Sequence, residues 1–161
     1  MKLIVALCLL ATSLTAFAKA KVSIFVSLSP AGSFTAVSEK PKGNLFKQGE
    51  SFTADKISMT IESFKTGIDL RDEHFWKHLN STKHDKAILT NLKASNGRAT
   101  ADLEVNGMKK PVSIAYKVSG EEVLATFSVK ASQFGLAKAE YLGVGVEDNV
   151  KVEAVLPYRT K

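Results

Sequence analysis

The segment from Ala99 to Val118, ATADLEVNGMKKPVSIAYKV, alternates apolar and polar residues on both sides of an Asn-Gly pair. Its apolar positions are Ala99, Ala101, Leu103 and Val105 before the pair and Val112, Ile114, Tyr116 and Val118 after it. Asn106 and Gly107 both tolerate the positive φ angles of a type I′ turn, so the pair is a strong hairpin signal. The segment therefore predicts two antiparallel strands with one apolar and one polar face.

The same period of two recurs along most of the chain. The further alternating sets are Val22, Ile24 and Val26; a short run around Phe34; Ile57, Met59 and Ile61; Ile88, Thr90 and Leu92; Val123, Ala125, Phe127, Val129 and Ala131; and Val150, Val152, Ala154, Leu156 and Tyr158. These runs predict roughly eight strands, and no room remains for the crossover helices of a parallel sheet. We therefore expect an all-β fold in which antiparallel strands close into a barrel or stack as a sandwich.

The expected interior is rich in alanine. Its small residues are Ala99, Ala101, Ala125, Ala131 and Ala154. Small inward side chains either admit large neighbours or leave a cavity, and an eight-stranded barrel can be solid or can hold a small ligand. Periodicity leaves both outcomes open.

The segment 68–80 breaks the alternation. Within it, Arg71–Leu79 predicts a short helix that Asp72 caps. We expect three apolar residues to share one face of this helix, namely Phe75, Trp76 and Leu79.

Three functions compete for this segment. His74 and His78 have the i, i+4 spacing of two metal ligands on one helical turn, with Asp72, Glu73 or His84 as further candidates. A second possibility is acid-base catalysis by Asp69, Asp72, Glu73 and His74. The chain offers no Gly-x-Ser-x-Gly nucleophile motif for it. The third is a lid, in which the apolar residues close the barrel mouth while Arg71 and Asp72 tie the loop down.

The first residues have the pattern of a secretory signal peptide. Lys2 precedes an apolar run from Leu3 to Leu14, and Ala16-Phe17-Ala18 is a small-x-small cleavage signal. The run is shorter than the ~20 residues that a membrane span needs. We expect a signal peptide at 1–18 and one mature domain at 19–161, located in the periplasm. Cys8, the one cysteine, leaves with the signal, so disulfides and thiolate chemistry are excluded.

The chain is basic, with 22 Lys and Arg against 16 Asp and Glu and a formal charge of +6. The basic residues are scattered and lie among acidic ones, whereas nucleic-acid-binding proteins cluster them. We expect no nucleic-acid partner. Transient contact with an anionic membrane surface fits the charge better.

Five short motifs occur in order along the chain: SPAGSF at 29–34, KTGIDLRDEH at 65–74, VNGMKKPV at 105–112, SQFG at 132–135 and VEDNV at 146–150. In this order they resemble the YceI-like family of exported bacterial proteins. The resemblance covers the chain from about Val22 to Tyr158. It implies a lipocalin-like antiparallel barrel with a long isoprenoid or quinone tail in an apolar channel, and no catalytic residues. One departure is that the phrase Val26–Phe34 lacks the histidine that many members carry there.

Together, residues and resemblance predict a non-enzymatic carrier that sequesters an isoprenoid, a quinone tail or a fatty-acyl chain inside a single eight-stranded barrel. No cofactor and no metal is predicted. The expected ligand-binding residues are Ile61, Leu103, Tyr116, Phe127 and Val129 inside, with Phe75, Trp76 and Leu79 at the lid. The alternative is an interaction module with a filled core. The sequence leaves the oligomeric state open, a homodimer included.

Overall fold

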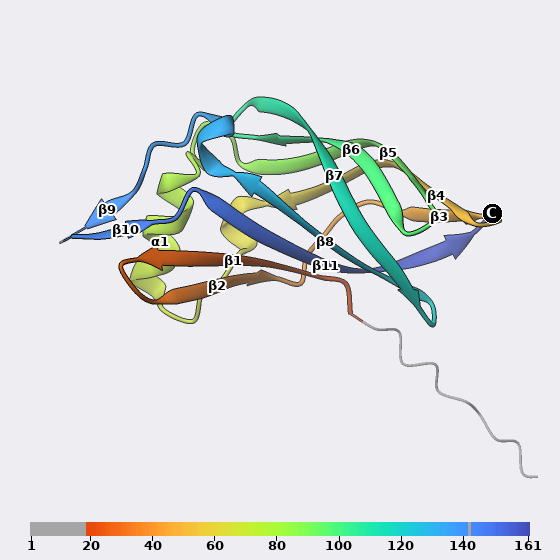
Figure 1. The fold of residues 1–161 in the computed structure, drawn as a ribbon, viewed down its shortest axis with the longest axis horizontal. Helices are drawn as coiled ribbons and strands as arrows, with labels where there is room; N and C mark the ends of the chain where they lie inside the picture. The colour runs from red at the N-terminus through yellow and green to blue at the C-terminus, as the bar shows by residue number, and fades with distance from the viewer. Residues whose placement is uncertain (1–18, 142) are drawn as a thin grey trace, which may run out of the picture.

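In the part of the chain that the structure describes, the fold is one continuous, rolled-up β-sheet with a single α-helix beside it (Figure 1). The computed structural model describes residues 19–141 and 143–161, so the predicted signal peptide at 1–18 lies outside the described residues. The elements are β1 (Lys21–Ser29), β2 (Ser33–Ser38), β3 (Leu45–Gln48), β4 (Ser51–Thr60), a 3₁₀ turn (Ile61–Ser63), α1 (Asp69–His78), β5 (Lys86–Ser95), β6 (Arg98–Val105), β7 (Met108–Ser119), β8 (Glu122–Lys130), a second 3₁₀ turn (Ala131–Phe134), β9 (Glu140–Tyr141), β10 (Val144–Val146) and β11 (Asn149–Thr160).

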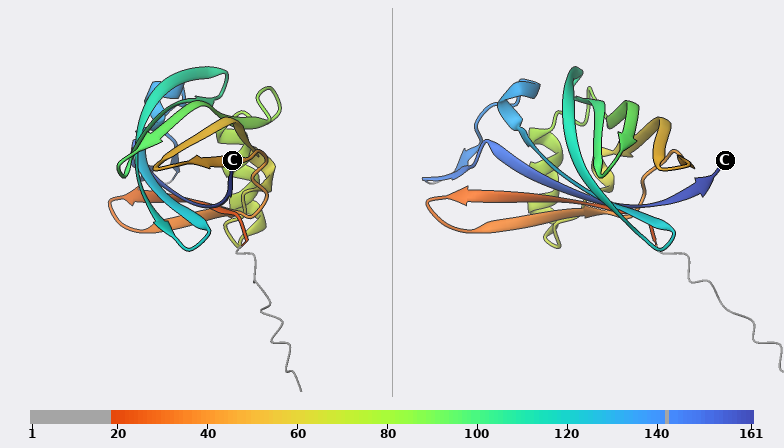
Figure 2. Two further views of the ribbon diagram at one scale, coloured as in Figure 1. Left: turned by 90° about the vertical axis from the view of Figure 1, so that its right-hand side faces the viewer. Right: turned by 45° about the vertical axis from the view of Figure 1, so that its right-hand side comes forward.

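The predicted eight-stranded, wholly antiparallel barrel is wrong in two respects. The barrel closes through 7 strands in the order β3-β4-β5-β6-β7-β8-β11, and β3 then pairs with β11. That closing pair is parallel, with Tyr158 opposite Leu45. An odd number of strands cannot alternate in direction around a closed ring, so one neighbouring pair must be parallel. Figure 2 (left) shows the ring along the long axis of the molecule.

The β1–β2 hairpin lies outside this ring. β1 pairs with the first part of β11, and the last residues of β11 pair with β3 instead. The free side of β2 forms one bridge, between Val37 and Lys65 in the loop before α1. The sheet therefore splits at β11, and the hairpin and α1 enclose a wider end.

The central hairpin is confirmed. β6 and β7 pair antiparallel from Arg98 opposite Ala115 to Val105 opposite Met108. Asn106 has a φ of 51° and Gly107 a φ of 70°, as the type I′ turn requires.

The predicted inward face of β5 is wrong in its first half. Ala87 and Leu89 face the interior, not Ile88 and Thr90, whereas Leu92 packs against the core as predicted. The register between β5 and β6 shifts after Thr90, where Asn91 adopts a φ of 55°. This bulge reverses the alternation.

One end of the barrel is filled. Phe52 is 2% exposed and packs edge-to-face on Tyr116 and Tyr158, with ring centroids 5.6 and 5.3 Å apart. Ala99 and Ala101 are buried in the same cluster, so here small residues admit large neighbours.

The predicted short helix is present as α1. Its N-terminal flanking residue is Ile68, and no side chain caps it. Asp72 lies inside the first turns, so its predicted capping role is wrong. No helix in the described part of the chain has the length and apolar character that crossing a membrane requires.

Candidate ligand cavity

The wide end of the barrel contains a cavity of about 320 Å³. This volume lies at the lower end of the ~300–1,000 Å³ typical of small-molecule pockets. The described lining residues are overwhelmingly apolar and come from β1, β2, β4, α1, β5, β6, β8, β10, β11 and the segments around both 3₁₀ turns. Ala131 and Ala154 belong to this lining, so in this half of the barrel small residues leave space.

The polar lining residues come from one element. Arg71, His74 and His78 all lie on α1, at spacings of three and four that place them on one helical face. His74 is exposed and His78 is half-buried. Burial lowers the pKa of His78, so its ring is neutral at neutral pH. The polar edge of the cavity is therefore confined to α1.

The structure brings six of the eight predicted ligand-binding residues together around this cavity: Ile61, Phe75, Leu79, Leu103, Phe127 and Val129. The other two lie elsewhere. Tyr116 packs against Phe52 in the filled end. Trp76 is not among the residues that line the cavity. Ligand binding by the six remains a prediction.

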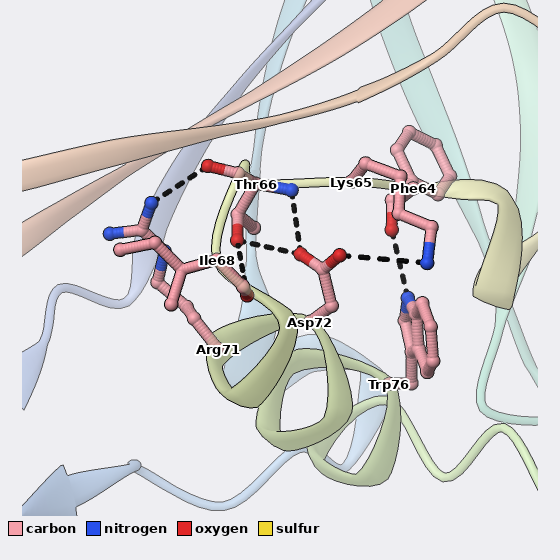
Figure 3. Close-up of polar contacts among 7 residues, drawn as sticks. All are labelled: Phe64, Lys65, Thr66, Ile68, Arg71, Asp72 and Trp76. Carbon is pink, nitrogen blue, oxygen red and sulfur yellow. Dashed lines mark hydrogen bonds and ion pairs between the residues drawn. The ribbon is translucent and has the colours of Figure 1, made fainter.

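Trp76 fixes the loop that precedes α1. Its Nε1–H donates a hydrogen bond to the carbonyl oxygen of Phe64 at 2.9 Å, and the Lys65 ammonium lies 4.2 Å from its ring centroid. Figure 3 shows Trp76 and Arg71 on opposite sides of the helix. Residues adjacent in sequence project in different directions from a helix, so Phe75 and Trp76 cannot share one face.

Several lining residues were not predicted from the sequence. Phe34 and Phe64 pack edge-to-face on Phe75, at 6.2 and 6.3 Å between ring centroids. Phe134 and Leu136 follow β8 and line the cavity as well. Phe64, Phe134 and Leu136 lie outside the alternating runs, and the run around Phe34 is too short to assign an inward face, so periodicity did not mark these residues as part of the lining.

Asp72 is the polar anchor of the same loop. It is 2% exposed and accepts hydrogen bonds from the Thr66 backbone N–H at 2.7 Å and the Thr66 hydroxyl at 2.6 Å. The Lys65 Nζ lies 3.6 Å from its other oxygen. Arg71 Nη2 donates to the Thr66 carbonyl oxygen at 2.8 Å (Figure 3). These contacts confirm that Arg71 and Asp72 tie the loop down.

The environment of Asp72 lowers its pKa overall. Burial by itself raises the pKa, but the two hydrogen bonds from Thr66 and the charge of Lys65 outweigh it. Since the folded-state pKa lies below the unfolded value near 3.8, the carboxylate contributes stability that is complete above about pH 5 and is lost as the pH falls through the folded pKa.

We expect Asp72→Asn to lower the free energy of unfolding by about 1–2 kcal/mol at pH 7, because a neutral acceptor replaces a charged one. The deficit should shrink as the pH falls below about 4, because the carboxylate then becomes protonated in the unfolded wild-type chain while it stays charged in the folded protein. Urea unfolding between pH 7 and pH 3 measures it, with Asp55→Asn at an exposed position of β4 as the control. A deficit that is constant across this range would contradict the assignment.

The predicted metal candidates do not converge. No group of three or more potential metal-ligating residues occurs in residues 19–141 and 143–161. His84 packs over the β6–β7 turn, where a Cβ added at Gly107 would meet its ring. The Asp72 carboxylate is engaged by Thr66 and Lys65.

Comparison with known proteins identifies a family model and several solved structures that are similar to this chain. The YceI-like domain model matches residues 12–157, whereas no curated protein sequence matches significantly. Similar solved structures include BcnA from Burkholderia cenocepacia, with a TM-score of 0.66, 16% identity, and coverage of 85% of this chain and 94% of that chain. Another is a polyisoprenoid binding domain from Saccharophagus degradans, with a TM-score of 0.58, 14% identity, and coverage of 84% and 91%. These structures share the fold, and since the family model matches most of the chain, the protein belongs to the YceI-like family.

Proposed function

We propose that this protein is a carrier that holds one long apolar chain, of isoprenoid, quinone-tail or fatty-acyl type, in the cavity at the wide end of the barrel. The observation that carries the proposal is the cavity itself. It is apolar from β1 around to β11, and the packed cluster around Phe52 closes its far end.

The energetics favour an apolar occupant. Cavities lined by apolar side chains stay dry and accept apolar molecules, because water finds no hydrogen-bond partners there. A bound chain gains about 25 cal/mol for each Å² of apolar surface that it removes from water. Rings such as Phe127 and Phe134 offer this contact along the cavity wall.

The relatives support the same class of ligand. The Saccharophagus degradans structure is described as a polyisoprenoid binding domain, and it shares the fold of this chain. The proposed role is binding without catalysis and without a cofactor. A protein with a filled core would act instead as an interaction module, and the cavity argues against that alternative.

The proposed site of action is the periplasm. The sequence pattern of residues 1–18 supports export, after which the mature chain from Lys19 would meet lipids outside the cytoplasm. The basic character of the protein would favour brief contact with anionic membranes during loading.

An uptake experiment tests the carrier function. The protein is incubated with vesicles that contain geranylgeraniol, separated from them, and weighed by native mass spectrometry. We expect one alcohol per chain. A protein that stays empty with geranylgeraniol, with longer polyprenols and with fatty alcohols would contradict the carrier function and favour the interaction module.

A further inference from the structure

Arg71 is the one lining residue that carries a permanent positive charge in the described part of the cavity wall. Its guanidinium carbon lies 5.0 Å from the centroid of the Phe34 ring, and one nitrogen, Nη2, bonds to the Thr66 carbonyl oxygen. The side chain is thus held against β2 at the edge of the cavity.

No carboxylate neutralises this guanidinium among the described residues. None of the ion pairs in residues 19–141 and 143–161 involves Arg71. The adjacent carboxylate, Asp72, points to Thr66 and Lys65 instead (Figure 3). The Arg71 Nε–H is buried and has no hydrogen-bond partner in the same part of the chain.

This arrangement is costly unless a ligand completes it. A buried donor without a partner loses its hydration and gains no hydrogen bond in return, which destabilises the folded protein. A guanidinium presents its N–H groups in a planar fork that matches the oxygens of a carboxylate or phosphate. The described apolar walls would contact a hydrocarbon tail, but they offer no hydrogen-bond acceptor to the N–H groups of the Arg71 guanidinium.

We propose that Arg71 binds the head group of the ligand, and that this head group is an oxyanion, a carboxylate or a phosphate, at one end of the apolar chain. The proposal rests on the carrier function and specifies its ligand. The tail then runs along Leu103, Phe127 and Val152, while the oxyanion contacts Nε and the free edge of the guanidinium.

The surroundings of Arg71 suit a charged head group. His74 lies one turn further along α1 on the same face and is exposed, so this edge of the cavity meets solvent. An oxyanion here would keep part of its hydration. A neutral head group, such as an alcohol, would accept a weaker hydrogen bond and leave the charge uncompensated.

Matched ligand pairs test the proposal. Geranylgeranyl phosphate and geranylgeraniol share one tail, as do palmitate and hexadecanol, so each pair differs in its head group alone. Dissociation constants come from calorimetry below the critical micelle concentration. We expect the oxyanion to bind more tightly than the alcohol in at least one pair, by a factor on the order of ten or more. The pair that shows the preference identifies phosphate or carboxylate.

Variants assign the preference to the residue. Arg71→Gln should remove the preference because it weakens binding of the oxyanion much more than binding of the alcohol, whereas Arg71→Lys, which keeps the charge but lacks the fork, should retain part of the preference. Arg98→Gln, at an exposed position of β6, removes the same charge away from the cavity and should change nothing.

Three results would overturn the inference while leaving the carrier function intact. The first is that the wild-type protein binds both members of each pair equally. The second is that Arg71→Gln weakens binding of the acid and of the alcohol alike, and the third is that Arg98→Gln has the same effect as Arg71→Gln. If the wild-type protein binds no member of either pair, the carrier function fails and the inference fails with it. The comparison of the two members of each ligand pair on the wild-type protein tests the head-group preference even if a variant folds poorly.

Discussion

Ala154→Trp is expected to abolish uptake of geranylgeraniol without destabilising the empty protein. Ala154 lines the cavity from β11, where it faces the space beside Val22 and Val152. An indole there fills volume that the ligand needs and gains apolar contacts. Uptake from vesicles and the melting temperature of the empty protein are the two measurements.

The matched control is Ala115→Trp. Ala115 is exposed on β7, so the same substitution leaves the cavity unchanged. We expect this variant to take up geranylgeraniol as the wild type does. Full uptake by Ala154→Trp would show that the ligand binds elsewhere and would refute the cavity as the binding site.

Phe52→Ala is expected to cost about 3–5 kcal/mol of unfolding free energy, the range for loss of a buried phenyl ring from a packed core. Its ring joins Tyr116 and Tyr158, and it is almost wholly buried at the filled end. For a domain of this size the loss corresponds to a fall in melting temperature of roughly 10 °C. Urea and thermal unfolding measure it.

The control for this substitution is Phe25→Ala on β1, where the ring is half-buried outside both core clusters, beneath the Lys151 ammonium. It should cost clearly less than Phe52→Ala. Equal losses would contradict the placement of Phe52 in a packed core.

Local patterns in the sequence predicted the long strands, but they did not predict which strands close the barrel. The Asn106-Gly107 turn and the alternation on both sides of it determine the β6–β7 hairpin within twenty residues of chain. Closure depends instead on β3, four residues long, and on its contact with the end of β11 more than a hundred residues later. A strand that short leaves no detectable period, so its place in the ring was missed.

Whether the barrel is hollow also depends on contacts between distant residues. Ala101 and Ala154 are both small residues on inward faces. Ala101 lies in the cluster that the Phe52 ring fills, whereas Ala154 faces the cavity. The identity of the residue across the barrel decides between packing and space, and a period of two does not specify it.

The candidate site was predictable where one helical face or one alternating run carried it. Phe75 and Leu79 are four residues apart on α1 and both line the cavity. Trp76 was misplaced because neighbours on a helix diverge, and the position of Arg71 depends on the Lys65–Ile68 loop folding back over the helix. Such loop geometry leaves no pattern in the sequence.

The carrier function is tested most directly by native mass spectrometry of the full-length protein, purified gently from its host cells, followed by solvent extraction and lipid identification. We expect a bound apolar chain at about one per protein, released by solvent and absent from Ala154→Trp. The carrier function would be contradicted if the wild-type protein carries no lipid, so that the masses of the wild type and Ala154→Trp differ by the substitution alone.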